Sequence, residues 1–465
     1  MPNLSNALQI GLSGLKASQM GLNVAGQNIA NVNTEGYTRQ RPIFEASKPI
    51  SFPAGVFGTG VNLLEIARFR DAFIDRQYRD QNQVLGDMEK QSQSMDMIEG
   101  IINEPSDTGL HNEIENFFNS LQDLATNPES SSVRTTVREQ GRALARMFNQ
   151  TWNHLDQIRD NKNLEIIDKV AEANGILDRI ASLNPQIATT EALGNKANDL
   201  RDSRDLLLDK LSKIVDMSAY EDPVNGSVTV SIGGQNFVVL DQVQHLMTES
   251  VNQNGKEVIQ IINPVEKSEI KLSGGEIHGI LEVRDTLIPK IEKEVDTLAS
   301  AIITEVNKIH RNGFGLQGGR TSPPTGIDFF EGTDSRTMKL SNQVESDPSN
   351  IAASKNGAPG DNVNALEMAQ LRNSEVLNNN TFTFEDYLGG IISSFGLESV
   401  GIQESLANQE KLVEHFKNFR ESQIGVNMDE ELMNLVTFQK AFGANARVLS
   451  TVNQMFDVVI ALGTF

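Results

Sequence analysis

Apolar residues recur every seven positions through the last long stretch of the chain, residues 426–462. One row contains Met428, Leu435, Phe442, Leu449 and Phe456. A second row, three positions further on, contains Phe438, Asn445, Val452 and Val459. Two such rows form the a/d seam of a coiled coil. A third row consists of Ala441, Val448, Met455 and Leu462. A helix with apolar residues on several rows usually packs against more than one neighbour, so the pattern predicts a long helix, capped by Asn427, with several partners.

Residues 3–31 carry a second seven-residue repeat, in which a large row alternates with a small one. The large row contains Leu8, Leu15, Leu22 and Ile29, and the small row contains Leu4, Gly11, Ser18 and Ala25. Small residues allow two helices to approach closely. Each internal glycine costs a helix about 1 kcal/mol against alanine, so this helix needs a partner to form. We therefore predict that residues 1–35 and 425–465 pair as a terminal coiled-coil domain.

The middle of the chain is predicted to be a helical domain with a β-rich insertion. Residues 36–215 and 285–424 have mainly helical spacing, with an extended segment at 41–70 and helix breaks at Pro105, Pro128, Asn161 and Pro185. From residue 216 the spacing of apolar residues changes from that of a helix to the two-residue spacing of β-strands. Gly233-Gly234 and Asn254-Gly255 are typical of hairpin turns, and EIKLSGGEIHGILEV is taken to complete the unit. The expected fold class is mainly α, with an inserted β-rich domain at 216–284.

The amino-acid composition argues against several classes of function. The 465 residues include 62 acidic and 40 basic side chains, for a net charge of −22, which argues against a nucleic-acid partner. The absence of cysteine excludes disulfides and thiolate chemistry. No stretch is apolar enough to cross a membrane, and no cleavable signal peptide is visible, so a membrane partner is not expected.

The sequence contains no motif that predicts catalysis. The six histidines are isolated, so no metal site is expected. Gly313, Gly315 and Gly318 match G-x-G-x-x-G, but the match follows a helix and opens a loop, whereas a dinucleotide site needs a strand before it and a helix after it. Carboxylates are spread over helix faces, where solvation is their ordinary explanation. We expect no cofactor and no enzymatic activity.

A short turn motif follows the first helix, in the sequence NIANVNTEGYTRQ at 28–40. The motif residues are Asn28, Ala30, Asn31, Thr34, Gly36 and Tyr37, in which asparagine and glycine suit a helix exit. Together with DEELMNLVTFQKAFGANARVLST at 429–451, this motif closely resembles the paired ends of bacterial flagellar axial proteins, the family of rod, hook and hook-associated proteins. Within that family, Gly36-Tyr37 followed by Arg39-Gln40 looks most like the hook-associated members that join hook and filament.

The resemblance implies a structural subunit that folds as it assembles. Its implied partners are further copies of itself in a ring or helical layer, the flagellar hook protein, a second hook-filament junction protein, and a cytoplasmic export chaperone at the C-terminal helix. It also implies type III export, without a cleaved signal peptide, to the extracellular flagellum. The expected subunit-interface residues are Leu8, Leu15, Leu22, Ile29, Leu435, Phe442, Leu449 and Phe456. A hook or rod protein, or less favourably a secreted coiled-coil effector or adhesin, is the alternative.

Overall fold

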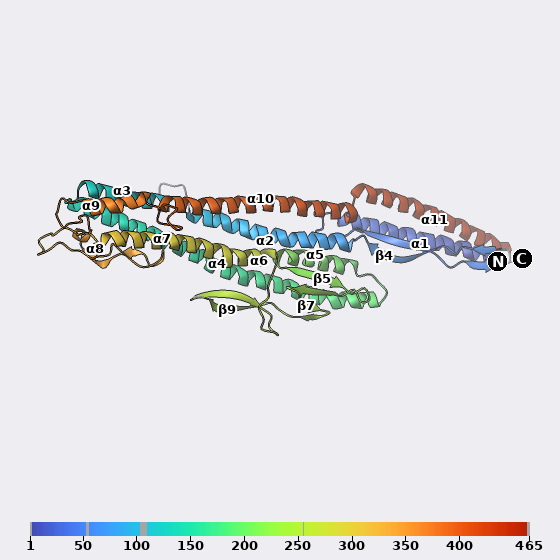
Figure 1. The fold of residues 1–465 in the computed structure, drawn as a ribbon. Helices are drawn as coiled ribbons and strands as arrows, with labels where there is room; N and C mark the ends of the chain where they lie inside the picture. The colour runs from blue at the N-terminus through green and yellow to red at the C-terminus, as the bar shows by residue number, and fades with distance from the viewer. Residues whose placement is uncertain (1, 53–54, 103–108, 254, 463–465) are drawn as a thin grey trace.

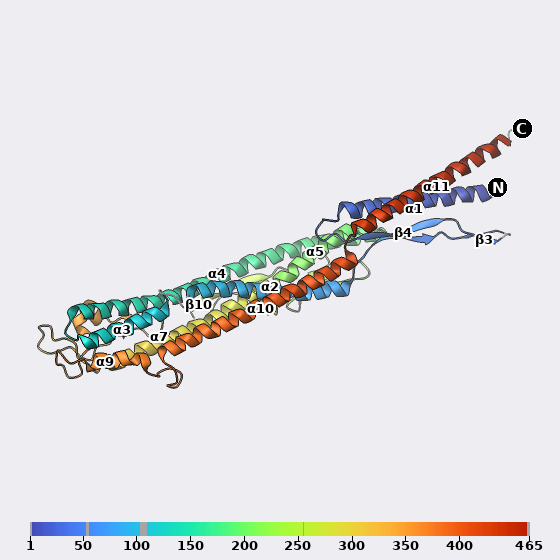
Figure 2. The ribbon, with the colours of Figure 1, turned by 90° about the horizontal axis from the view of Figure 1, so that it is seen from above.

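The computed structural model describes residues 2–52, 55–102, 109–253 and 255–462 of an elongated molecule. Both chain ends lie at one tip, where α1 (Pro2–Ala30) and α11 (Met428–Leu462) run side by side in opposite directions (Figures 1 and 2). The predicted long C-terminal helix is confirmed, and Asn427 caps it by accepting hydrogen bonds from the backbone N–H groups of Asp429 and Glu430. The predicted pairing of the two ends is therefore observed within one chain.

A β-ribbon lies beside the pair of helices α1 and α11. Strands β1 (Gln40–Ala46) and β4 (Val61–Arg68) are antiparallel, and β2 (Ile50–Phe52) and β3 (Gly55–Phe57) extend the ribbon toward the tip. Ser13 of α1 holds the ribbon by accepting a hydrogen bond from the N–H of Val61. The extended segment expected at 41–70 is thus a ribbon that lies along α1 (Figure 2).

The remainder is a long helical body. Its main helices are α2 (Ala72–Ile102), α3 (Leu110–Thr126), α4 (Ser131–Ala192), α5 (Asn198–Ile214), α7 (Ile288–His310) and α10 (Phe384–Ile424). At the far end, Phe117, Phe118, Phe329, Phe330 and Phe384 form an aromatic core. Short elements cover this end, namely β11 (Phe330–Glu331), β12 (Lys339–Leu340), α8 (Asn342–Ser346) and α9 (Val363–Gln370). The body therefore has its densest aromatic packing away from the terminal pair.

Two of the predicted helix breaks are wrong. Helix α4 runs through both Asn161 and Pro185 without interruption, whereas the break at Pro128 is confirmed and Pro105 lies outside the described residues. A proline inside a helix removes one backbone hydrogen bond. The loss is offset here because Asn184, next to it, is fully buried and bonds the backbone of Val228 and the carbonyl of Leu240. Tertiary contacts therefore keep the helix continuous through Pro185.

The β-rich unit differs from the prediction in its last segment, which is helical. Its main sheet has the order β5 (Met217–Glu221), β6 (Val228–Ile232), β7 (Gln235–Val239) and β8 (Gln242–Val243), and β9 (Met247–Gln253) pairs with β10 (Lys256–Ile262). The turn at Gly233-Gly234 is confirmed, with positive φ at both glycines, while Asn254 of the second predicted turn lies outside the described residues. In contrast, EIHGILEV is not a strand, because 275–282 form helix α6, which continues through a π-helical turn into α7. The sheet shares one apolar core with α4, α5 and α6, and the domain limits at 216 and 284 stay a prediction.

Candidate assembly interface

The seam between α1 and α11 is formed by the small row of α1. Gly11, Ser18 and Ala25 are buried, and a Cβ atom at Gly21 would lie 2.5 Å from the ring of Phe438. At Gly14 the added atom would lie 2.8 Å from the amide of Asn445, and at Gly11 it would lie 3.1 Å from Leu449. Large residues of α11 therefore rest directly on the backbone of α1, which explains why an unfavourable helix former carries so many glycines.

The predicted interface residues are only partly covered within one chain. All eight are half-buried, and these are Leu8, Leu15, Leu22, Ile29, Leu435, Phe442, Leu449 and Phe456. Of the four from α11, Leu449 lies against Gly11 of α1, and in the neighbouring row Phe438 and Asn445 lie against Gly21 and Gly14. The large row of α1 is less buried than its small row. Both rows thus retain apolar surface that the paired helices do not cover.

The third row of α11 lies at the edge of the seam, where Val448 approaches Gly11 of α1. Val448 is 47% exposed and Met455 is 50% exposed, while Ala441 is half-buried and the side chain of Leu462 lies outside the described residues. Further exposed apolar side chains on this helix are Leu432, Met433, Val436, Val458 and Ile460. A single chain therefore leaves much of the apolar surface of α11 in contact with solvent.

The turn motif is a hydrogen-bonded hub centred on Asn28, which is 1% exposed. Its amide nitrogen donates to the carbonyl of Gln40 at 2.9 Å and to Glu431 at 3.0 Å. Its oxygen accepts from the N–H of Gln40 at 3.0 Å and from the hydroxyl of Tyr37 at 2.8 Å. Every hydrogen-bonding group of this side chain is used, so the motif joins α1, β1 and α11 at one point.

The remaining motif residues shape the turn itself. Asn31 accepts a hydrogen bond from the hydroxyl of Thr34, and Gly36 adopts φ +80° against Leu206. Burial, followed by the charges of Asp199 and Asp202, raises the pKa of Tyr37 well above its usual range. Its hydroxyl therefore keeps its proton and donates at neutral pH. Of the six motif residues, Asn28 and Ala30 lie at the end of α1, and Asn31, Thr34, Gly36 and Tyr37 lie in the turn that follows it.

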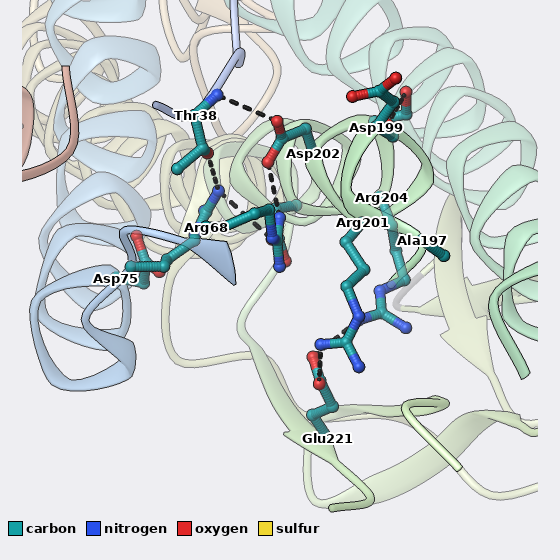
Figure 3. A network of polar contacts seen from close by, with 12 residues as sticks. Thr38, Arg68, Asp75, Ala197, Asp199, Arg201, Asp202, Arg204 and Glu221 are labelled. Carbon is teal, nitrogen blue, oxygen red and sulfur yellow. Dashed lines mark hydrogen bonds and ion pairs between the residues drawn. The ribbon is translucent and has the colours of Figure 1, made fainter. Parts of the chain in front are cut away.

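Arg39, Glu430 and Glu431 belong to the motifs found in the sequence, but their pairing around the hub was not predicted. Arg39 pairs with Glu430 at 2.7 Å and with the buried Glu431 at 2.8 Å, which ties the turn to the first turn of α11. The N–H of Thr38 donates to Asp202 of α5 at 2.9 Å (Figure 3). These partners are remote in sequence, so no local pattern could have identified them.

A row of buried aspartates on α5 lies beneath the turn. Asp202, Asp205 and Asp209 are each less than 9% exposed and lie on one face of the helix. Their partners are Arg68, Arg70, Arg79 and Arg420, which come from the ribbon, the link to α2, α2 and α10. Figure 3 shows Thr38 and Arg68 both directed at Asp202. Burial alone would raise the pKa of Asp205, but Arg70, Arg79 and Arg68 hold it well below its usual range, so this carboxylate stays ionised.

The described part of the chain contains no cluster of side chains with the geometry of a metal site. Among the same residues, no helix is both long and apolar enough to span a lipid bilayer.

Comparison with known families agrees with the sequence patterns. Residues 95–330 match a family model described as the flagellar hook-associated protein FlgK helical domain. Residues 8–38 match the flagella basal body rod protein family, and residues 422–462 match the C-terminal family of flagellar basal body rod FlgEFG proteins. The three matches cover the body from residue 95 to residue 330 and most of both helices of the terminal pair.

Relatives match along nearly the whole chain. The chain is 32% identical to flagellar hook-associated protein 1 of Bacillus subtilis (strain 168), over 96% of each chain. It is 26% identical to the protein of that name from Escherichia coli (strain K12), over 98% of this chain and all of the relative. The solved structure of the flagellar hook junction protein FlgK from Burkholderia pseudomallei is similar in fold, with a TM-score of 0.63 and 16% identity, over 75% of this chain and all of that one.

Proposed function

The chain belongs to the flagellar hook-associated protein 1 family, structural subunits of the bacterial flagellum at the junction between hook and filament, and we propose that α1 and α11 are the elements through which its copies assemble. The resemblance indicated by the two terminal segments is thus confirmed, as is the mainly α fold with a β-rich insertion. A hook or rod protein and a secreted adhesin are not favoured, since the relatives over the full length are hook-associated proteins.

The observation that supports the proposal most is the incomplete burial of α11. Its seam with α1 covers one side, while Val448 and Met455 are about half exposed. Burying apolar surface stabilises association by about 25 cal/mol for each Å² removed from water. Neighbouring copies that cover this third row would supply that energy. A single chain does not.

Charge distribution also favours association through the termini. Helix α1 carries one charged residue, Lys16, and α11 beyond its first turn carries only Lys440, Arg447 and Asp457. The net charge of −22 therefore comes almost entirely from the rest of the chain. Copies that meet through their terminal pairs avoid most of the repulsion that their bodies would feel.

The proposed mechanism is coupled folding and assembly. Contacts between different patches of successive copies generate a ring or a helical layer. By its family resemblance, this layer meets the hook protein on one side and a second hook-filament junction protein on the other. An export chaperone in the cytoplasm would cover α11 until type III export, since its exposed apolar rows would otherwise associate early.

Truncation tests this proposal. A chain that lacks residues 426–465 is expected to keep a folded body but to be absent from isolated flagella. Circular dichroism of the purified protein checks the fold, and immunoblotting of flagella checks incorporation. Normal filament attachment by the truncated chain would overturn the proposed role of α11.

A further inference from the structure

Three chain segments lie between the terminal pair and the body. One face of α5 binds residues in or next to the first two, and it binds the end of α10 just before the third. The first is the turn at 31–39, the second is the link from β4 to α2 at 69–71, and the third is the link from α10 to α11 at 425–427. Thr38 of the first segment bonds Asp202, and Arg68 and Arg70 around the second bond Asp202 and Asp205. Arg420, shortly before the third, pairs with Asp209 at 2.6 Å.

This face of α5 is a continuous buried polar stripe. Its members recur every three or four residues, which places them on one side of the helix, and they are Asn198, Asp202, Asp205, Asp209 and Ser212. Asn198 extends the contact to the ribbon by donating to the carbonyl of Ile66 at 2.8 Å. The opposite side, with Leu207, Leu208 and Leu211, packs in the body core. Helix α5 is therefore joined to the body by apolar contacts and by the polar bonds of Asp209 to α2 and α10. Its contacts with the terminal part are the polar bonds of Asn198, Asp202 and Asp205.

Apolar packing contributes little to this attachment. Among the described residues, neither of the two apolar cores of the body includes a residue from α1, the ribbon or α11. Cavities of about 1000 Å³ and 700 Å³ border the stripe, the first lined by Asp209 and the second by Asp205, with Arg70 lining both. Open space beside a hydrogen-bonded joint leaves room for rotation once its bonds are broken.

We propose that Asp202, Asp205 and Asp209 are positioning residues that set the orientation of the terminal pair relative to the body. Orientation depends on direction-specific hydrogen bonds and ion pairs here, since close apolar packing does not hold the two parts together. Loss of an aspartate leaves both parts folded but frees the angle between them. One consequence of the inference rests on the proposed function, namely that every copy presents its seam to neighbouring copies at one fixed angle. The orientation itself is a property of the single chain.

The test measures the distance between the two parts in the full chain. The protein has no cysteine, so Glu404→Cys on α10 and Thr451→Cys on α11 would carry the only two spin labels. Both positions are exposed. We expect one narrow distance distribution in the otherwise unchanged chain. In Asp202→Ala it is expected to broaden or to gain a second maximum.

The distance measurement includes a matched control and a second variant of the joint. Glu398→Gln removes a surface ion pair with Lys290, away from the joint, and is expected to leave the distribution narrow. Arg420→Gln removes the ion pair to Asp209 from the α10 side, and it is expected to broaden the distribution as well. The fluorescence of Trp152, the only tryptophan, reports the urea midpoint of the body, which is expected to stay unchanged in both joint variants.

Three results would overturn the inference. The distribution could be broad before any joint residue is changed, it could stay narrow in both joint variants, or the body midpoint could fall in both. The last result would assign these side chains to the stability of the body. Because the measurement uses the free chain, it can fail while the truncation experiment succeeds, and the reverse also holds.

Discussion

Asn28 and Glu431 lie 403 positions apart in sequence and form a buried hydrogen bond of 3.0 Å between the end of α1 and the start of α11. The same Glu431 pairs with Arg39, and the same Asn28 bonds Tyr37 and Gln40. Two polar residues therefore link the turn, the ribbon and both terminal helices. The seam between α1 and α11 begins at this pair of residues.

Asn28→Ala is expected to loosen the start of the seam. It removes the hydrogen bonds of Asn28 to Glu431, to Tyr37 and to the backbone of Gln40, while Glu431 keeps its ion pair with Arg39. Each buried group left unpaired costs about 1–3 kcal/mol. Amide hydrogen exchange in residues 28–40 and 428–440 is expected to accelerate by at least about thirtyfold, equivalent to roughly 2 kcal/mol. Asn33→Ala, at an exposed position in the same turn, is the control. Equal protection in the two variants would contradict the role of Asn28.

Gly21 and Gly26 offer a matched pair within α1. A Cβ atom at Gly21 meets the Phe438 ring at 2.5 Å, whereas one at Gly26 meets no atom within 4 Å. Gly21→Ala should separate the helices at a cost of about 1–3 kcal/mol, more than the ~1 kcal/mol gained in helix propensity. Gly26→Ala should gain that ~1 kcal/mol without a clash. Hydrogen exchange of α1 measures both, and similar protection in the two variants would show that the close approach is unimportant.

Asn184 should be far more sensitive than Asn161, although both lie in α4. Asn184 is fully buried and bonds the sheet backbone, whereas Asn161 is exposed. Asn184→Ala is expected to lower the free energy of unfolding by about 2–3 kcal/mol, because buried backbone groups lose their partner. Asn161→Ala should be neutral or slightly stabilising, since alanine is the better helix former. Urea unfolding followed through Trp152 makes the comparison, and a small effect at Asn184 would refute the explanation of the unbroken helix.

His310 gives the body a predictable acid sensitivity. It is fully buried, its Nδ1 donates to the carbonyl of Ile327, and its Nε2 accepts from the N–H of Ala352, so the ring is neutral. Burial lowers its pKa from 6.5 to about 4. Between these values the unfolded chain binds more protons than the folded one, so stability falls as pH drops from about 6.5 to about 4, by about 3 kcal/mol in total.

The variant His310→Gln removes this titration. Its stability at neutral pH is expected to be lower, but the part of the pH dependence that comes from this ring should disappear between pH 6.5 and 4. His245→Gln, at a half-exposed histidine, serves as the control and should retain the part of the pH dependence that comes from His310. Urea midpoints at a series of pH values provide the measurement. An unchanged profile in His310→Gln would contradict the assignment.

The elements that sequence predicted well are those with long, regular periods. The seven-residue rows of α11 were sufficient to predict a long helix and its seam, and Gly233-Gly234 predicted a tight hairpin turn, as observed. EIHGILEV was assigned wrongly because a short apolar run fits both strand and helix spacing. The predicted helix break at Pro185 is wrong because the neighbouring Asn184 bonds Val228 and Leu240, which are far away in sequence.

The polar joint could not be predicted for a different reason. The aspartates on α5 have helical spacing that ordinary solvated faces share, so spacing alone gives no sign of burial. Their partners come from four separate elements and meet only in the folded chain. Ion pairs between residues that are far apart in sequence can be identified only from the folded structure.

Chemical labelling of α11 tests the central claim most directly, namely that neighbouring copies cover its outer apolar row. Met455→Cys and Val224→Cys would each carry the only thiol of the chain, the first on α11 and the second at a 91% exposed position of the body. In the free protein, both thiols are expected to react readily with a maleimide. In isolated flagella, we predict that the thiol on α11 is protected while the thiol on the body still reacts. Equal labelling of the Met455→Cys variant in the free protein and in flagella would contradict the account.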